Sequence, residues 1–537
     1  MRLPLSLLSL LVAASLVAQP APPKVQEAPL RAHLAFLADD LLEGRGTGQR
    51  GAELTVRYLE SQLQALGVPP VPGHPYRQPV SLLGLRTLPD RSTLSFQAGG
   101  ACSTPVFGTD IVFGSGVAKA EQTFDAPVVF LGFGIDAPDY HWDDFKGQDV
   151  RGKVLLVLVN EPQPTAAEPG LFDGPNLSIY GRWTTKFEMA ARHGAAGVLL
   201  VHSTAAASYG WPVVRNGWDG ERFCLAKDPE GTPLEGWLTE ETARALVQRG
   251  GQDLDTLRAQ AQRRDFRPVP LDLTLKGNLA SAVRNVEQFN VAGVVPGTDP
   301  RLKQELVVYS AHWDHLGKGA APLPNAPKGH ETDTIYNGAV DNASGCAALL
   351  AMAKSAAARP AKRSQMFLFV CAEEQGLLGS KAYAAAPLWP LARTAADLNL
   401  DSLNWVAPTR DIGLPFGDRS TLGETGRALA KTQGLTVAPP RPDTAGGYFR
   451  SDHYSFVQAG VPALSVGGGR DYLGADPKAL RAKAATMGAR YHQVTDEYDP
   501  TWDLRGMVQQ AQFTLDLGQV VANAAKKPRF LKPVGTR

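Results

Sequence analysis

Four short apolar runs in the second half of the chain are each followed directly by polar or glycine-rich segments. They cover residues 306–309, 366–370, 398–400 and 463–466. Continuous apolar runs of this length suit strands that are buried on both faces of a largely parallel sheet flanked by helices. In such sheets, ligands gather at the carboxyl ends of the strands. The pattern therefore predicts an α/β fold whose chemistry lies along one edge of a mixed, largely parallel sheet.

Histidines and carboxylates follow these runs or break the loops between them. The positions of interest are His312, Asp314, Asp341, Glu373, Glu374, Asp401 and His492. Imidazole together with carboxylate suits zinc, or a similar divalent ion, better than calcium or an iron–sulfur cluster. Two ions about 3.5–4 Å apart repel each other and need a carboxylate that bridges both. We therefore predict a site for two zinc ions (Zn2+) per chain.

The positions of five of these residues favour a division between the two ions. Asp341 opens a helix after a long loop, so its short side chain is the natural bridge. His312 and Asp401 then complete one ion, and Glu374 and His492 the other. Each ion would have three protein ligands and room for a shared water.

The two remaining carboxylates are predicted to act in catalysis. Glu373 and Glu374 are adjacent and cannot point the same way from an extended backbone. This leaves Glu373 free to take a proton from water and pass it to the leaving amine. Asp314 lies two residues after His312 and is expected to accept the other imidazole N–H, which would orient the ligand.

Five motifs in this segment match, in order, those of the M28 family of zinc metallopeptidases. They are residues 312–314, 341–345, 373–374, 401 and 491–492, within a resemblance that spans 278–523. The helices expected between residues 30 and 66 resemble the N-terminal segment of the family. The resemblance implies a zinc-exopeptidase-like fold and an aminopeptidase with the ligand division given above and Glu373 as general base.

A sixth segment, residues 446–453, resembles a family segment whose tyrosine approaches the substrate carbonyl. This resemblance implies that Tyr448 stabilises the oxyanion, and Tyr491 is its rival for that role. Either tyrosine could equally be a packed side chain with a satisfied hydroxyl. His315 and His453 are expected to support the site or the fold rather than to bind metal.

The chain is long enough for two domains, and an insert is predicted within the peptidase domain. Strand-like runs alternate with a helical stretch between residues 124 and 267, and this segment resembles the β-rich protease-associated (PA) domain. The expected organisation is a signal peptide over 1–18, the N-terminal part of the peptidase domain over 19–123, the PA-like insert over 124–267, and the catalytic M28-like domain over 268–537.

The first residues and the overall charge bear on location and partners. The apolar run 3–18 is shorter than the ~18–20 residues that span a bilayer, so it predicts a signal peptide and a secreted or periplasmic protein. An uncleaved anchor is the alternative. The net charge is +1, which gives no sign of nucleic-acid or anionic-membrane binding. The four cysteines form no CxxC pair and are too few for a disulfide scaffold.

Several alternatives to an aminopeptidase acting on peptides remain open at this point. A glutamate-carboxypeptidase-like enzyme needs a cationic clamp for the C-terminal carboxylate, and Arg419, Arg450 and Arg470 are available in loops. A glutaminyl-cyclase-like activity and a non-catalytic receptor scaffold of the same architecture are more distant possibilities. The complete ligand set and Glu373 argue against a scaffold. The oligomeric state stays open.

Overall fold

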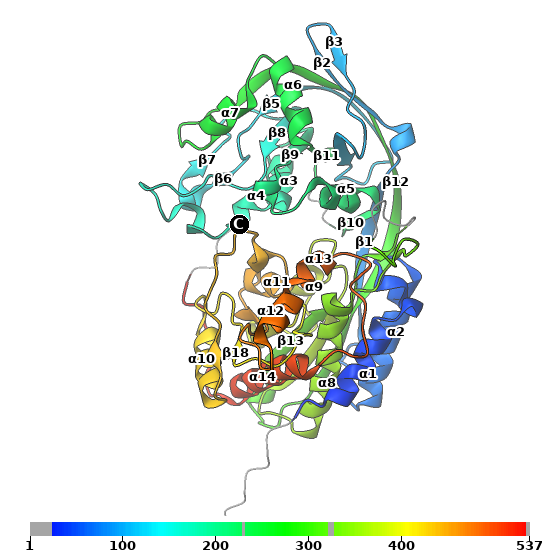
Figure 1. The fold of residues 1–537 in the computed structure, drawn as a ribbon, viewed down its shortest axis with the longest axis vertical. Coiled ribbons are helices and arrows are strands. Elements are labelled where there is room, and N and C mark those ends of the chain that lie inside the picture. Colours follow the sequence, from blue (N-terminus) through cyan, green and yellow to red (C-terminus); the bar gives the residue numbers. More distant parts are fainter. Residues whose placement is uncertain (1–23, 228–230, 320–326, 533–537) are drawn as a thin grey trace, which may run out of the picture.

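A single long strand joins the two halves of the molecule. The computed structural model describes residues 24–227, 231–319 and 327–532, so the predicted signal peptide lies outside the described residues. Strand β12 (Val269–Val295) begins in the sheet of the insert and ends in the sheet of the catalytic half. It runs along one side of both halves, with the insert stacked above the catalytic half in the view of Figure 1.

The catalytic half is built on the strands that the apolar runs predict. Its sheet has the order β20-β17-β13-β16-β12, and the first four strands are parallel while β12 is antiparallel to β16. The bounds are β20 (Ala463–Ser465), β17 (Thr394–Asn399), β13 (Leu306–His312) and β16 (Ser364–Val370). Every residue of β13, β16 and β17 is buried, which confirms the predicted mixed, largely parallel sheet.

Helices cover both faces of this sheet and create a separate core on each. Alternate side chains of β13 point to opposite faces, so that Val307 and Tyr309 join one core and Leu306 and Val308 the other. The first core is covered by α1 (Glu27–Leu37), α2 (Arg50–Ala65), α8 (Ser344–Ala358) and α14 (Arg505–Asn523). The second is covered by α9 (Leu378–Ala385) and α11 (His453–Gln458).

The alanine-rich α8 is buried along nearly its whole length and packs against α1 and α14. Its small side chains allow neighbouring elements to approach closely, which brings the loop before α8 down to the edge of the sheet. The remaining catalytic elements are β14 (Gly317–Lys318), β15 (Ile335–Tyr336), β18 (Asp411–Ile412), α10 (Thr421–Thr432), β19 (Thr436–Val437), α12 (Pro477–Ala485) and α13 (Met487–Arg490).

The insert has its own parallel sheet and its own cores. The strand order is β12-β5-β8-β9-β11-β4, in which β5, β8, β9 and β11 are parallel and the flanking strands are antiparallel. Their bounds are β5 (Glu121–Phe130), β8 (Val154–Leu158), β9 (Gly197–Val201), β11 (Leu234–Leu238) and β4 (Ile111–Gly114).

Short helices and hairpins complete the insert. The helices are α3 (Trp183–Arg192), α4 (Thr204–Ala207), α5 (Trp211–Asp219), α6 (Glu240–Arg249) and α7 (Leu254–Ala261). Further strands of the insert are β2 (Thr93–Ala98), β3 (Ala101–Ser103), β6 (Asp136–Ala137) and β7 (Trp142–Asp143). Strands β1 (Arg77–Thr87) and β10 (Arg222–Leu225) belong to the sheet of the catalytic half, where β1 pairs with β12 and β10 pairs with β1. Helices α3, α4 and α5 lie on the side that faces the catalytic half (Figure 1). Within the described ranges, no helix is long and apolar enough to cross a membrane.

Candidate metal centre

The predicted metal ligands converge at the carboxyl edge of the catalytic sheet. His312 Nε2 lies 3.3 Å from Asp341 Oδ1 and 3.5 Å from Asp401 Oδ1. His492 Nε2 lies 3.4 Å from Asp341 Oδ2 and 3.0 Å from Glu374 Oε2. The two carboxylate oxygens of Asp341 thus face different histidines, each of which has a second carboxylate beside it. This is the arrangement that two bridged cations require.

The histidine nitrogens that face this centre fit metal ligation. Nε2 of His312 and of His492 has no hydrogen-bond partner among the described residues, although each atom is buried. Buried polar atoms are normally hydrogen-bonded, so such unpartnered nitrogens beside carboxylates suit a divalent cation. His312 is 1% exposed whereas His492 is 26% exposed, so the centre opens toward solvent on the side of His492.

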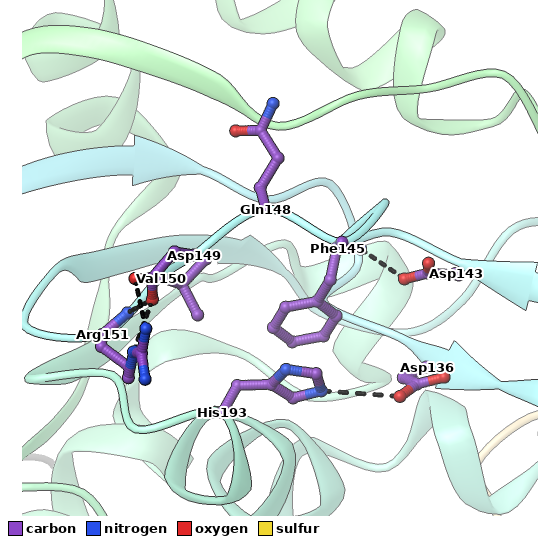
Figure 2. Close-up of a pocket in the computed structure, with 9 residues that line it drawn as sticks. Asp136, Asp143, Phe145, Gln148, Asp149, Val150, Arg151 and His193 are labelled. Atoms are coloured by element: carbon purple, nitrogen blue, oxygen red, sulfur yellow. Dashed lines mark hydrogen bonds and ion pairs between the residues drawn. The ribbon is translucent and has the colours of Figure 1, made fainter.

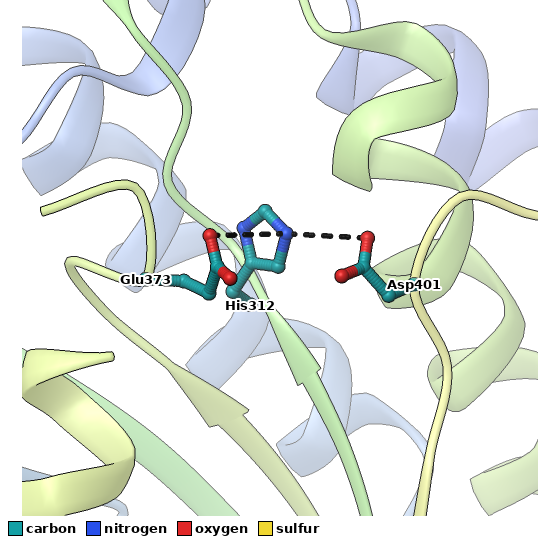
Figure 3. A group of neighbouring side chains, drawn as sticks. All are labelled: His312, Glu373 and Asp401. Atoms are coloured by element: carbon teal, nitrogen blue, oxygen red, sulfur yellow. Dashed lines mark ion pairs between the residues drawn. The ribbon is translucent and has the colours of Figure 1, made fainter. Parts of the chain in front are cut away.

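The adjacent glutamates turn in different directions, as their opposite predicted roles require. Glu373 Oε2 lies 4.0 Å from His312 Nε2, and in Figure 3 His312 lies between Glu373 and Asp401. Glu374 instead accepts a hydrogen bond of 2.7 Å from His315 Nδ1 and contacts His492. Glu373 remains close enough to the His312–Asp401 side to act on a group bound there.

The pKa values of the same two glutamates are shifted in opposite directions. Burial raises the pKa of Glu373 well above its usual value, and the neighbouring carboxylate of Glu374 adds to the rise. Burial by itself would also raise the pKa of Glu374, but the charges of His492 and His315 outweigh it and lower this pKa to about 2. Glu374 therefore stays ionised, as a ligand must, while Glu373 readily holds a proton. The pKa values of the two neighbouring carboxyl groups are thus shifted in opposite directions, which suits one ligand and one proton carrier.

Asp314 holds a different partner from the one expected. His312 Nδ1 lies 3.1 Å from the backbone oxygen of Asp314, whereas the nearest carboxylate oxygen of Asp314 is 3.8 Å away. The carboxylate instead accepts the backbone N–H groups of Glu373 at 3.0 Å and Glu374 at 3.3 Å. The backbone after His312 thus places the carbonyl of Asp314 closer to the imidazole ring than its carboxylate. Asp314 thus positions both glutamates, and its main chain orients the histidine.

The two candidate tyrosines occupy different surroundings. The ring of Tyr491 stacks on His492 with 3.8 Å between the ring centres, and its hydroxyl accepts a 2.9 Å hydrogen bond from Arg450. Tyr448 is buried in an aromatic cluster with Phe416 and Phe449, and among the described residues it has no contact with the metal-centre side chains. Tyr491, the rival candidate in the sequence, is therefore the tyrosine beside the centre.

Asn342 and Gly345 bring the bridge and the Asp401 strand end together. The side chain of Asn342 donates to the carbonyl of Leu400 at 2.9 Å and accepts the N–H of Gly345 at 3.0 Å. A β-carbon at Gly345 would lie 2.6 Å from the oxygen of Leu400, so only glycine permits this approach. The predicted motif 341–345 thus fixes the separation between Asp341 and Asp401.

Left-handed backbone conformations recur at the centre. Ala372, Ser402 and His492 have φ values of 51°, 57° and 56°. Non-glycine residues adopt this region rarely and at some cost, and they concentrate at functional sites. Each of the three lies at or next to a residue of the centre. The sharp change of direction turns the side chains of Glu373, Asp401 and His492 toward one another.

The model of Peptidase family M28 matches residues 290–515. This segment includes every predicted metal ligand, from His312 to His492, and lies within the resemblance seen in the sequence. The chain carries an M28 peptidase domain.

One curated protein and one solved structure are similar to this chain over different lengths. Leupeptin-inactivating enzyme 1 of Streptomyces exfoliatus is 29% identical over 187 residues, which are 34% of this chain and 36% of that enzyme. The match thus spans about a third of the curated relative. The structure of the aminopeptidase from Aneurinibacillus sp. strain AM-1 is similar over 94% of this chain and 96% of its own, with 20% identity and a TM-score of 0.55.

A second solved structure, the zinc aminopeptidase BSAP from Bacillus subtilis, is 16% identical. It covers 94% of this chain and 97% of its own, with a TM-score of 0.47. The Aneurinibacillus likeness shows that the complete fold, including the insert, occurs in a known structure. At 20% identity it shows the fold alone.

Asp496 holds the loop of Asp341 in place, a role that no motif in the sequence indicates. Its carboxylate is fully buried and accepts the backbone N–H of Val340 at 3.1 Å and that of Asp341 at 3.0 Å. It follows His492 by four residues, so it connects the loops of two ligands. The nearness of Asp496 to His492 is visible in the sequence, but the contact with Asp341 is not.

Replacing Asp496 by asparagine will weaken zinc binding by about 10- to 100-fold, because the amide removes one of the acceptors that orient Asp341. Competition with a chromogenic chelator measures this affinity. Asp499→Asn is the matched control, since Asp499 also accepts a backbone N–H, from Thr501 at 2.8 Å, but lies in an exposed turn. An unchanged zinc affinity in the Asp496 variant would show that Asp341 needs no such support.

Arg45 ties the N-terminal segment to the loops of the metal centre. Its guanidinium is 1% exposed and donates to the carbonyls of Trp313 at 2.9 Å, Asn337 at 2.6 Å and Gly338 at 2.9 Å. A fourth bond reaches the carbonyl of Leu37. The loops that follow His312 and precede Asp341 are therefore tied together by one buried cation. No motif in the sequence distinguished this arginine.

Arg45→Met will lower stability by about 3 kcal/mol or more, since each buried carbonyl left without a donor costs about 1–3 kcal/mol. We expect the melting temperature to fall by about 5 °C or more. Thermal unfolding followed by fluorescence checks this, with Arg50→Met as the control because Arg50 is 69% exposed. Equal melting temperatures for the two variants would contradict the anchoring role.

Other features of the M28 protein lie apart from this centre. A cavity of about 430 Å³ in the insert is lined by residues such as Asp136, Phe145 and His193 and contains no residue of the metal centre (Figure 2). His330, Asp333 and Glu497 also bring ligand atoms within 4.8 Å of one another. These three side chains are only half-buried, and His330 pairs with Asp333 at 3.3 Å. They are therefore satisfied without a cation.

Proposed function

We propose that this chain is a two-zinc aminopeptidase that releases the N-terminal residue of peptides. One observation carries the proposal: the two oxygens of Asp341 face His312 and His492 separately, at 3.3 and 3.4 Å. A carboxylate placed in this way would be able to hold two cations, one at each oxygen. His312 and Asp401 would hold the first zinc, and Glu374 and His492 the second.

Zinc, when bound at these residues, supplies the Lewis acidity that polarises a peptide carbonyl and acidifies water. The side chains perform the remaining tasks. Glu373, whose pKa is raised by burial, takes a proton and returns it to the departing amine. The hydroxyl of Tyr491 lies at the open side of the centre and is available to a developing oxyanion.

The acidic character of the centre supports the choice of an aminopeptidase. A free N-terminus is a cation, and Asp401 and Glu373 both face His312 Nε2, with exposed side-chain fractions of 20% and 9%. These carboxylates can attract an ammonium group that approaches from solvent. The structurally similar protein from Aneurinibacillus is described as an aminopeptidase, which supports the same choice.

Export is part of the proposal. The apolar run at residues 3–18 supports a signal peptide and thus a secreted or periplasmic enzyme. We also assign the insert as a PA-like domain at the entrance to the metal centre. Expression with and without residues 1–18, followed by fractionation and sequencing of the mature N-terminus, tests the location. Retention of the complete N-terminus in the cytoplasmic fraction would contradict it.

The activity is tested by metal analysis and hydrolysis together. We expect about two zinc ions per purified chain and cleavage of aminoacyl-arylamides that stops when a chelator is added. Restoring zinc after dialysis should restore the rate. A chain that binds zinc but cleaves only substrates with a blocked amine would contradict the aminopeptidase assignment. A chain that holds no metal and has no turnover would contradict the proposal altogether.

A further inference from the structure

The insert is docked on the catalytic domain immediately beside the metal centre. The backbone N–H of Leu177 donates to the carbonyl of Asp443 at 2.8 Å, and the N–H of Asp443 donates to Asn176 Oδ1 at 2.9 Å. Arg419 of the catalytic domain pairs with Asp173 of the insert at 3.1 Å. These contacts hold residues 173–177 of the insert against the loop before Tyr448.

The docking places Arg182 of the insert over the catalytic loop. Arg182 directly precedes α3, and a β-carbon added at Gly446 would lie 3.0 Å from its Cδ. Gly446 also has a φ of 67°, which suits glycine. The absence of a side chain at this position therefore makes room for the arginine. The sequence does not reveal this placement, because 264 residues separate Arg182 from Gly446.

Arg450 reaches the same region from the catalytic side. Its guanidinium donates to the hydroxyl of Tyr491 at 2.9 Å, and its central carbon lies 5.9 Å from the centre of that ring. The ring of Tyr491 stacks in turn on His492 at 3.8 Å. The cationic group of Arg450 is therefore one aromatic ring away from a predicted zinc ligand.

Neither guanidinium has a carboxylate at ion-pair distance in the part of the chain that the structure describes. Both side chains are half-buried. Partial burial and the nearby charge of Arg450 lower the pKa of Arg182 to about 10. The other candidate arginines differ, because Arg419 is paired with Asp173 and Arg470 is exposed. Two neighbouring cations without a counter-charge, still reachable from solvent, suit an anionic ligand.

We infer that Arg182 and Arg450 form a binding site for the free C-terminal carboxylate of the substrate. This inference rests on the proposed function and names its substrate class. The carboxylate of the last residue lies only about 3.8 Å beyond the scissile carbonyl when one residue follows it. A group held beside Tyr491 therefore belongs to the first residue after the cleaved bond. An aminopeptidase with this site is selective for dipeptides.

Four substrates separate this inference from the proposed function. They are Ala-Leu, Ala-Leu amide, N-acetyl-Ala-Leu and N-acetyl-Ala-Leu amide, and kcat/KM is measured for each with the zinc-loaded full chain. Blocking the amine tests the aminopeptidase assignment, whereas blocking the carboxylate tests the arginine site. We expect Ala-Leu to exceed its amide by about 10- to 100-fold, mainly through KM, because a charge-assisted bond to Arg is lost.

Substitution of Arg182 shows whether this preference arises at the arginines. Arg182→Met will reduce the ratio of Ala-Leu to Ala-Leu amide by about tenfold or more, and Arg182→Lys will retain part of it because the charge remains. Arg192→Met is the matched control, since Arg192 lies on α3 but its side chain is 51% exposed. The control should keep the wild-type ratio.

The outcomes divide clearly between the two proposals. Equal rates for Ala-Leu and its amide, or an unchanged ratio in Arg182→Met, would overturn the carboxylate site and leave the aminopeptidase standing. A preference for Ala-Glu amide over Ala-Leu would also overturn it, because the bound carboxylate would then be a side chain. Cleavage of N-acetyl-Ala-Leu in preference to every free-amine substrate would overturn the aminopeptidase, while its preference over the N-acetyl amide would support the arginine site.

Discussion

Replacing Glu373 by glutamine will lower kcat by about 10²- to 10⁴-fold while the zinc content stays at the wild-type level. The amide has the same shape as the carboxyl group but cannot take or return a proton. The side chain lies 4.0 Å from His312 Nε2, farther than the carboxylates of Asp341 and Asp401, so its loss should leave the ligands in place. Steady-state kinetics and elemental analysis of the same preparation measure the two quantities.

The adjacent glutamate supplies the matched control for this prediction. Glu374→Gln weakens a ligand that contacts His492 at 3.0 Å, so the zinc content of this variant should fall together with its activity. The Glu373→Gln and Glu374→Gln variants should therefore differ in zinc content. An activity of Glu373→Gln within tenfold of wild type would remove Glu373 from proton transfer. A loss of zinc from this variant would instead make Glu373 a ligand.

Asp341→Asn will lower the zinc content below that of the wild type and reduce activity by about 10³-fold or more, since metal polarisation supplies several kcal/mol to the transition state. The asparagine side chain has only one oxygen and cannot face both histidines. A group of buried carboxylates also depends on cations for its stability. At a free zinc concentration 1,000 times Kd, binding stabilises the folded chain by about 4 kcal/mol.

Thermal unfolding with and without a chelator measures this stabilisation. The chelator should lower the melting temperature of the wild-type chain by several degrees and have a much smaller effect on Asp341→Asn. Asp333→Asn is the control, because Asp333 lies apart from the metal centre and pairs with His330 at 3.3 Å. If Asp341→Asn kept two zinc ions and the full response to the chelator, the bridging role would be wrong.

The catalytic sheet could be predicted from the sequence because its evidence is local. The apolar runs that form β13, β16 and β17 are fully buried, and each is followed within a few residues by the side chain that it delivers to the centre. Strand order was not required for this prediction, because the carboxyl ends of parallel strands meet at one edge. The same argument explains why the sequence alone indicates His312, Glu374 and Asp401 as residues of the centre.

Contacts between distant segments could not be predicted in this way. Arg45 reaches loops almost 300 residues away, and Asp496 accepts from Asp341 across 155 residues. The sequence predicts that the carboxylate of Asp314 contacts His312, whereas in the structure the backbone carbonyl of Asp314 lies nearest to the ring. Hydrogen-bond geometry depends on how the loops pack, and the local sequence does not predict this packing.

The sequence by itself therefore determined the residue types of the metal centre, the strands that deliver them and the family of the peptidase domain, because periodicity and spacing act over short distances. Only the tertiary structure decided which tyrosine lies beside the centre and which arginines have no counter-charge. Tyr491 and Arg450 approach each other across 41 residues, and the insert brings Arg182 to the same place. These relations arise when the insert packs on the catalytic domain, since burial and long-range contact, rather than local pattern, set the environment of a charge.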